Sequence, residues 1–345
     1  MLPVFTTDTL AVQAKVRFDR HGTIPRWRNP VLDQLLSSRL LTIHRSPDFD
    51  HFRSIESLGD HRSIPLHWRN FAACFAAVTL KSCSIYLQRS FPRILQAQYS
   101  STGAIVAFAM DDAVSVIIDG VEIRSPSVLL VKGEAACEIV EPQANLNGFI
   151  KFDAIEDRGW PGEAGAARLI ATQPAALAAL RSVTRDILLL ASNSADLLAQ
   201  PQVIGQLEES LLQATDHVLQ TPSQPGDAGR VDLDNYLRLV RKLDEFLHHN
   251  AAQVVHSADL ARELGVSVRT LNNAVVAIRG LSMHRYMRLR RLWNVRQLLV
   301  QGAAAEGLKA IALANGFWHM GEFRTLYRDL FGETPQQTLD GARQH

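Results

Sequence analysis

The chain has 345 residues, of which 47% are apolar and 21% charged, and its formal net charge is +1. This length predicts two or three domains, and the composition is ordinary for a soluble globular protein. No apolar run reaches the ~18 residues that a membrane helix needs, and the first residues lack the basic and apolar regions of a signal peptide. We therefore expect a cytoplasmic protein without a membrane partner.

The positive charge is concentrated in one segment. Residues 262–296 contain eight arginines and a single acid, whereas residues 174–220 contain two arginines and five acids. A basic segment within a nearly neutral chain indicates a localised binding site for a polyanion.

A β domain is predicted over residues 41–152, after a short helix in residues 30–41. Asp119-Gly120 is a two-residue hairpin signal between VSVII and VEIRS. The other strand-like runs are SIYLQRSF, ILQAQYS, AIVAFAM and SVLLVKG, with almost no helix between them. This spacing favours an antiparallel sandwich or barrel.

Two amphipathic helices are predicted after the β domain. The stretch 156–165, rich in glycine, ends the β region, and PAALAALRSVTRDILLLASN and VIGQLEESLLQATDHVLQ then repeat apolar residues at helical spacing. These helices either form a subunit interface or pack on their own sheet. We interpret residues 221–230, which are rich in proline, glycine and small polar residues, as an interdomain linker.

The remaining residues, 231–345, are predicted to be helical and contain an internal repeat. LARELGV (260–266) aligns with IALANGF (311–317), and residues 271–280 then align with residues 323–332. Each copy predicts a helix, a glycine turn, a second helix and a glycine stop, which is the helix-turn-helix arrangement.

The turns of the repeat contain the residues that this motif needs. Gly265 and Gly316 can adopt the left-handed conformation that redirects the chain. Ser267 is a favourable N-cap for the second helix of the first copy, whereas His319 is a weaker cap in the second. A connecting helix over residues 282–301 is roughly 30 Å long, close to the ~34 Å turn of B-DNA. The duplication therefore predicts two second helices that enter successive major grooves.

These motifs resemble those of the AraC/XylS family of bacterial transcription activators. The resemblance covers about residues 257–339, and GFWHMGEF further resembles the branch that includes ethanolamine-utilisation regulators. The matching residues are Ala261, Gly265, Ser267, Leu271, Gly280, Ser282, Tyr286, Arg288, Arg290, Arg296, Leu298, Leu299, Ile311, Ala312, Gly316, Phe317, Phe323, Phe331, Gly332 and Pro335.

Three positions depart from the family pattern. Val275 stands where phenylalanine is usual, and Met283 stands where proline is common. Gly321 lies on the exposed face of the second reading helix, where it offers no side chain and loosens the helix.

The outward positions of each second helix are the candidates for contact with bases. Arginine pairs with guanine and asparagine with adenine in the major groove, and the resemblance places base contacts at these positions. The predicted base-contacting residues are Arg269, Thr270, Asn272, Asn273, Met320, Glu322, Arg324 and Thr325. The predicted phosphate-contacting residues are Ser267, Arg285, Arg288, Arg290, Arg291, Arg296, His319 and Arg328. Some of these arginines are expected to pack on the connector or to pair with acids instead, and Trp293 and Tyr286 are expected in the core.

The resemblance implies a multidomain α+β protein that responds to a small effector. We expect an antiparallel, cupin-like β-barrel that binds the effector (1–170), a helical dimerisation segment (171–220), the linker (221–230) and an all-α DNA-binding domain with two helix-turn-helix motifs (231–345). The implied partners are double-stranded promoter DNA, a second copy of the chain and RNA polymerase.

The β domain offers weaker signals for its ligand. RSFPR contributes Arg89 and Arg93, which either bind an anionic effector or flank a hairpin at the surface. No catalytic residues, cofactor or metal site are expected, because the histidines lack the His-x-His spacing of metal cupins. The alternatives are a β-barrel enzyme with a helical C-terminal domain, which needs a nucleophile or metal set that the sequence lacks, and an effector-independent repressor.

Overall fold

The computed structural model describes most of the chain beyond its first 29 residues. The described residues are 30–46, 52, 55–67, 71, 73–112, 115–123, 126–155, 158–198, 200–220, 230–250, 255–301 and 307–342. The predicted linker, apart from Arg230, lies outside them.

An antiparallel sheet forms the β domain, after the short helix α1 (Pro30–Gln34). Its strands are β1 (Leu41–Ser46), β2 (Gly59–Pro65), β3 (Ala73–Thr79), β4 (Cys83–Arg89), β5 (Arg93–Ala109), β6 (Ile117–Ile118), β7 (Val121–Glu122), β8 (Ser127–Glu141), β9 (Leu146–Phe152) and β10 (Ala166–Ala171), with the 3-10 turn η1 (Glu56–Leu58) before β2. The hydrogen-bonded order is β1-β3-β4-β9-β5-β8-β6-β7, with β10 on β8 and β2 on β5.

Two long strands bend and divide the sheet into two layers. The register between β5 and β8 shifts between Ser100 and Ala104, where a Cβ on Gly103 would lie 2.3 Å from the Phe152 carbonyl oxygen. Gly133 has a φ of 71° in the middle of β8. The first layer contains β1, β3, β4, β9 and β10 with residues 104–109 and 127–132, and the second contains β2, β6 and β7 with residues 93–100 and 134–141.

The predicted antiparallel, cupin-like β domain is thus confirmed, with two differences. The described strands form an open sheet of two layers and not a closed barrel, because their hydrogen-bonded path runs from β1 to β7 without returning to β1. The runs predicted as separate strands on either side of residues 100–103 are one bent strand. The Asp119-Gly120 hairpin is confirmed, since both residues have positive φ, 49° and 82°, as a tight two-residue turn requires.

The helical pair after the β domain covers the first layer. Helices α2 (Pro174–Asn193) and α4 (Pro201–Gln220), joined by α3 (Ala195–Leu198), bury Leu180, Ile187 and Leu211 against that layer. The Trp160 indole nitrogen donates to Asp216 of α4 at 2.6 Å. The inner faces of these helices therefore pack on their own sheet.

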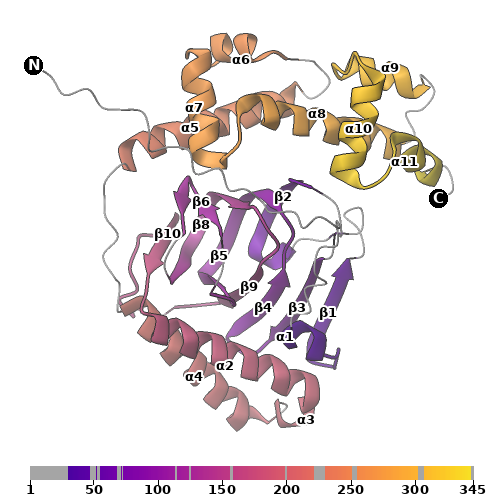
Figure 1. The fold of residues 1–345 in the computed structure, drawn as a ribbon. Helices are drawn as coiled ribbons and strands as arrows, with labels where there is room; N and C mark the ends of the chain where they lie inside the picture. Colours follow the sequence, from indigo (N-terminus) through magenta and orange to yellow (C-terminus); the bar gives the residue numbers. More distant parts are fainter. Residues whose placement is uncertain are drawn as a thin grey trace, which may run out of the picture.

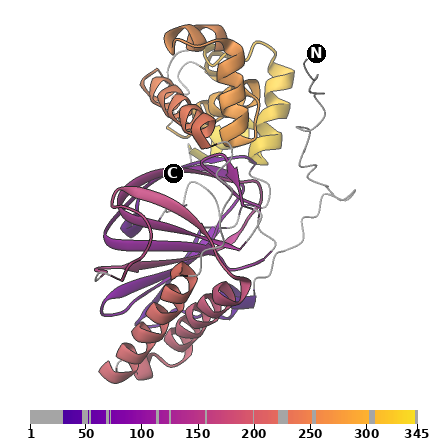
Figure 2. The same ribbon diagram turned by 90° about the vertical axis from the view of Figure 1, so that its left-hand side faces the viewer.

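Seven helices form the C-terminal region. They are α5 (Arg230–His249), α6 (Ser257–Glu263), α7 (Val268–Arg279), α8 (Met283–Val300), α9 (Gly307–Ala314), α10 (Met320–Phe331) and α11 (Pro335–Ala342). Figures 1 and 2 show them on the opposite side of the β domain from α2 and α4. Ile94 and Val140 of the second layer belong to their apolar core, so the molecule is stacked as helical pair, first layer, second layer and C-terminal helices.

Candidate nucleic-acid interface

The internal repeat folds into two helix-turn-helix units, α6–α7 and α9–α10, joined by α8. Gly265 and Gly316 turn the chain with φ of 68° and 79°, and Gly280 and Gly332 end the second helices in the left-handed conformation. Thr334 and Gln337 form the reciprocal hydrogen bonds of a capping box at α11. The predicted order of helix, glycine turn, second helix and glycine stop is therefore confirmed in both copies.

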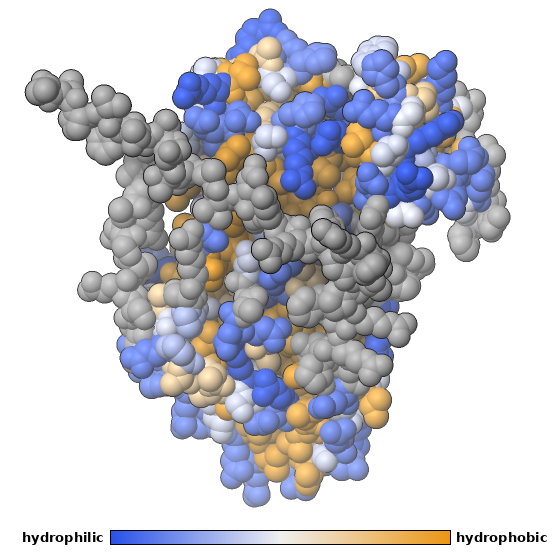
Figure 3. All heavy atoms as spheres, in the orientation of Figure 1, coloured by the Kyte–Doolittle hydropathy of each residue, from blue (hydrophilic) through white to orange (hydrophobic). Residues whose placement is uncertain are grey.

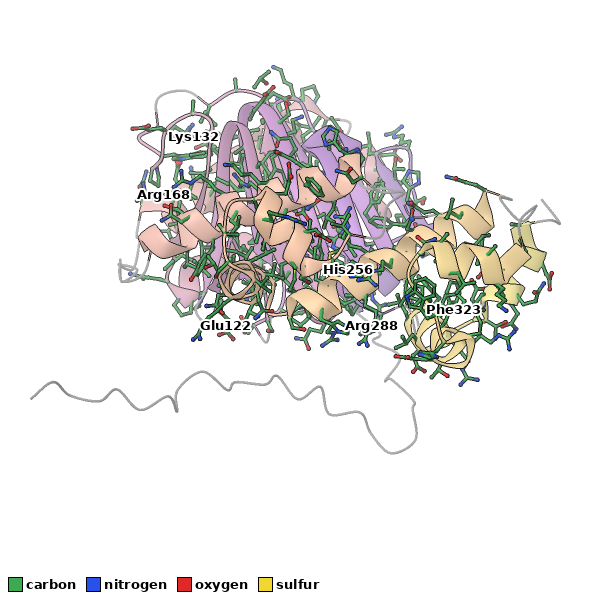
Figure 4. All side chains as sticks on the ribbon, turned by 90° about the horizontal axis from the view of Figure 1, so that it is seen from above. Glu122, Lys132, Arg168, His256, Arg288 and Phe323 are labelled. Carbon is green, nitrogen blue, oxygen red and sulfur yellow. The ribbon has the colours of Figure 1, made fainter. Side chains whose placement is uncertain are left out.

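The second helices, α7 and α10, lie near opposite ends of α8 and run in the same direction. Figure 1 shows both descending toward the β domain, and Figure 4 looks nearly along both, with Arg288 of α8 labelled between them. The space-filling view shows a largely hydrophilic surface over these helices, with apolar atoms in the band toward the strands (Figure 3). The arrangement presents two helix faces on one side of the molecule.

On α7, the predicted base-contacting residues are in two situations. Arg269 and Asn273 are exposed. Thr270 and Asn272 are half-buried: the Thr270 amide donates to the N-cap Ser267 at 3.0 Å, and the Asn272 side-chain oxygen accepts from the Met283 amide at 3.0 Å. Arg269 and Asn273 thus remain for a ligand, while Thr270 and Asn272 help hold the helix ends.

On α10, the outward side chains are more open. Glu322, Arg324 and Thr325 are exposed and Met320 is half-buried. His319 is exposed at the N-cap, but its side chain makes no capping hydrogen bond, in line with the weaker cap predicted there. Residue 321, one turn before Thr325 on this face, is the glycine noted in the sequence.

The arginines predicted to contact phosphates fall into two groups. Arg285 of α8 and Arg328 of α10 are exposed, and Arg288 is half-buried. Arg290 instead bonds to the Tyr286 hydroxyl at 3.0 Å and pairs with Asp244 at 3.3 Å.

Two further arginines of α8 differ in burial. Arg296 is buried and forms an ion pair with Glu333. Arg291 is half-buried, and this burial lowers the pKa of its guanidinium. Together with Arg290, Arg296 is thus a structural residue, as the sequence led us to expect for part of this set. Tyr286, expected in the core, is buried there.

Three apolar residues on the outer surface are absent from the predicted set. Val268 and Val276 of α7 are 46% and 44% exposed, and Trp318 before α10 is 74% exposed. An exposed valine beside Arg269 and Asn273 suits contact with a thymine methyl group. The sequence gives no sign of this exposure, because an apolar residue in an amphipathic helix is read as core.

A buried arginine at the end of α7 was also not predicted. Arg279 donates from Nε and Nη2 to both carboxylate oxygens of Glu138 in β8, the latter at 2.8 Å, and pairs with Asp244 of α5. Burial alone would lower the pKa of this guanidinium, but Asp244, Tyr286 and Glu138 raise it well above its ordinary value. The guanidinium therefore stays charged and joins the two regions of the molecule.

A cavity of about 660 Å³ lies between the two β layers and beside the start of α2. Arg93 reaches its wall but is fully engaged: Nε donates to Glu141 at 2.6 Å, and Nη1 and Nη2 donate to Ser63 and Gln88. Arg89 does not line the cavity. The structure therefore does not bring the two predicted effector arginines together at this cavity.

Apolar side chains predominate in the rest of the cavity lining, which also contains Asp111, Asp112, Asn147 and Arg181. Leu95, Ala107, Leu129 and Phe149 are among the lining residues. Tyr99 also lines it, and no described residue forms a hydrogen bond with its hydroxyl. This wall suits an apolar ligand with one hydrogen-bonding group.

Within the described residues, no group of three or more His, Cys, Asp or Glu side chains is placed to hold a metal ion. No described helix combines the length and the apolar character required to cross a bilayer.

The two linked helix-turn-helix units have the architecture that many DNA-binding domains share. Residues 260–341 match the family model for a helix-turn-helix domain. The chain is 34% identical over 102 residues to a probable thc operon regulatory protein of Rhodococcus erythropolis, covering 29% of this chain and 31% of that protein. It is 33% identical over 96 residues to the XylDLEGF operon transcriptional activator of Pseudomonas putida, covering 28% and 30%.

Among solved structures, a probable AraC family transcriptional regulator from Rhodopseudomonas palustris CGA009 is 35% identical, with 30% of this chain and 97% of that chain covered and a TM-score of 0.28. The C-terminal residues of this chain are thus similar to those of AraC/XylS-type regulators. The matches span about a third of the length of the curated relatives.

Proposed function

We propose that the protein is a sequence-specific transcription regulator, acting in the cytoplasm, whose DNA affinity responds to a small effector. The observation that carries this proposal is the placement of α7 and α10, which run in the same direction, near the two ends of the 18-residue helix α8. Such a helix is about 27 Å long, and major grooves on one face of B-DNA recur every ~34 Å. The two helices can therefore enter successive grooves with little bending of the DNA.

The residue roles follow from exposure. Arg269 and Asn273 of α7 and Arg324, Glu322 and Thr325 of α10 supply the base contacts, with Met320 at the edge of the same face. The phosphate contacts come from the exposed or half-buried residues around this face: Ser267, Arg285, Arg288, Arg291, His319 and Arg328.

The effector is proposed to occupy the cavity between the β layers. Both arginines of the lining are engaged. Arg93 pairs with Glu141, whose carboxylate also accepts from Ser90 and Asn147 at 2.8 Å. Arg181 pairs with Asp112 and donates to the Ala109 and Asp111 carbonyls, so an anionic ligand would lack a free cation. We infer a largely apolar, uncharged effector that bonds to the Tyr99 hydroxyl. The outer faces of α2 and α4 are proposed to form a homodimer. The activator name of the Pseudomonas relative supports activation, and RNA polymerase is the partner that we propose for this role.

Selection of DNA by the full chain tests this function. We expect a pool of random duplexes to yield a preferred site with two contacted segments about 10 base pairs apart. Affinity for this site should fall steeply as salt rises, because phosphate contacts release counterions. A pool that shows no enrichment at low salt would contradict the proposal.

A further inference from the structure

The second β layer is a single sheet layer that separates the cavity from the C-terminal helices. On β8, Ile139 and Glu141 line the cavity, whereas Glu138 and Val140 contact the C-terminal helices. Successive side chains of a strand point to opposite faces. If a ligand in the cavity displaces this strand, the strand therefore displaces the helices that it contacts on its other face.

The strongest contact across this wall is the ion pair of Glu138 with Arg279. The Arg279 side chain is fully buried and that of Glu138 is 4% exposed. The guanidinium donates to both carboxylate oxygens, and its central carbon, Cζ, lies 4.1 Å from the centre of the Tyr286 ring. Because Arg279 is the last residue of α7, this pair fixes the end of the first reading helix relative to β8.

Other contacts surround this ion pair. A Cβ on Gly120, at the tip of the β6–β7 hairpin, would lie 2.9 Å from the Ile278 side chain of α7. Arg241 of α5 donates to the Ala136 carbonyl of β8 at 2.9 Å. The first helix-turn-helix unit is therefore seated on the strands that line the cavity.

We propose that Glu138 and Arg279 are positioning residues that couple the cavity to α7, so that filling the cavity changes DNA affinity through this ion pair. The inference rests on the proposed DNA-binding function. A buried bidentate pair is either closed or replaced by another arrangement, since a buried charge without a partner is strongly disfavoured. It is thus a two-state element that cavity occupancy can bias.

Two substitutions, with one control, test whether the ion pair couples the cavity to α7. Glu138→Gln removes the charge that crosses the wall, while Arg279 keeps its pairing with Asp244 inside the C-terminal region. Glu134→Gln is the matched control, because Glu134 is exposed on the same strand. Ala107→Phe fills the cavity from the first layer, where Ala107 pairs with Leu129 and Phe149, so it does not alter the layer that contacts α7.

The measured quantity is the Kd for a duplex selected by the unmodified chain. We expect Ala107→Phe to change this Kd about fivefold or more in the unmodified and Glu134→Gln backgrounds. The same substitution should change it less than about twofold in the Glu138→Gln background, as a double-mutant cycle for coupled residues requires. If Ala107→Phe does not fold, as judged by thermal melting, Leu169→Trp fills the cavity from β10 instead.

An equal change in the Glu138→Gln and Glu134→Gln backgrounds would overturn the coupling, and so would the absence of any change on filling the cavity. Failure of the unmodified chain to select or bind DNA would instead contradict the proposed function. The two failures are therefore distinguishable in one series of measurements.

Discussion

The two helix-turn-helix units share the same order of helices and glycine turns but differ in the contacts that anchor them. Each unit is held by a buried arginine. In the first, Arg279 pairs with Asp244 and also with Glu138 of the β domain. In the second, Arg296 pairs with Glu333, whose carboxylate also accepts from the Thr338 hydroxyl at 2.7 Å, within the C-terminal region. Duplication thus produced one unit attached to the β domain and one that is anchored locally.

The second helices of the two units, α7 and α10, also differ in their N-caps and in their outward side chains. The side chain of Ser267 caps helix α7, and the outer face of this helix carries Arg269 and Asn273. The N-cap of helix α10, His319, makes no side-chain capping bond, and Gly321 interrupts the outer face of that helix. We infer that the first unit reads sequence more strongly and the second mainly extends the binding site.

The largest expected effect tests the anchor of the first unit. Arg279→Met leaves Glu138 and Asp244 buried without their shared cation, so we expect a loss of about 3–5 kcal/mol in the free energy of unfolding. Arg262→Met is the control, since Arg262 is 77% exposed in its pair with Asp259 and should change stability little. Chemical denaturation measures both, and equal effects would show that the buried pair is not an anchor.

The next effect tests the reading faces. Arg269→Ala should weaken binding to the selected site by about 1–3 kcal/mol, with a much smaller loss on random duplex, because a base contact carries sequence discrimination. Arg324→Ala should cost less, since α10 is the weaker reader. Kd values on both duplexes check this, and a larger loss for Arg324→Ala would reverse the assignment of roles.

The comparison also shows what the sequence can and cannot predict. Gly265, Gly316 and the N-cap Ser267 act locally, so their positions in the chain were enough to predict the turns of both units and the cap of the first. The partners of Arg279 and the engagement of Arg93 depend on residues far apart in the chain, Glu138 and Glu141, which only the folded sheet brings near. An exposed Val276 is equally invisible, because its exposure depends on which face of α7 meets the core.

A smaller effect, dependent on pH, tests how the hairpin tip meets the first unit. Burial raises the pKa of Asp119 from 3.8 to about 6, so between these pH values the folded state binds more protons than the unfolded state. The ionised carboxyl therefore lowers the free energy of unfolding most above pH 6. Asp119→Asn keeps an acceptor for the Glu138 amide and tolerates the positive φ.

We therefore expect Asp119→Asn to raise stability by about 1 kcal/mol at pH 7.5, with the gain shrinking toward pH 4. Melting temperatures across this range measure the change, and Asp60→Asn, at an exposed position of β2, serves as control. A gain that is independent of pH would show that the carboxyl is not destabilised by burial.

The smallest expected effect sharpens the difference between α7 and α10. A Cβ on Gly321 meets nothing within 4 Å, so Gly321→Ala should stabilise α10 by roughly 0.5–1 kcal/mol through helix propensity. Gly332→Ala, which also has open space but a φ of 74°, should destabilise the same unit instead. If the gain at residue 321 also tightens binding to the selected site, order in α10 limits its reading; unchanged affinity alongside a higher melting temperature would show that the side chains available on α10, rather than its stability, make it the weaker reader.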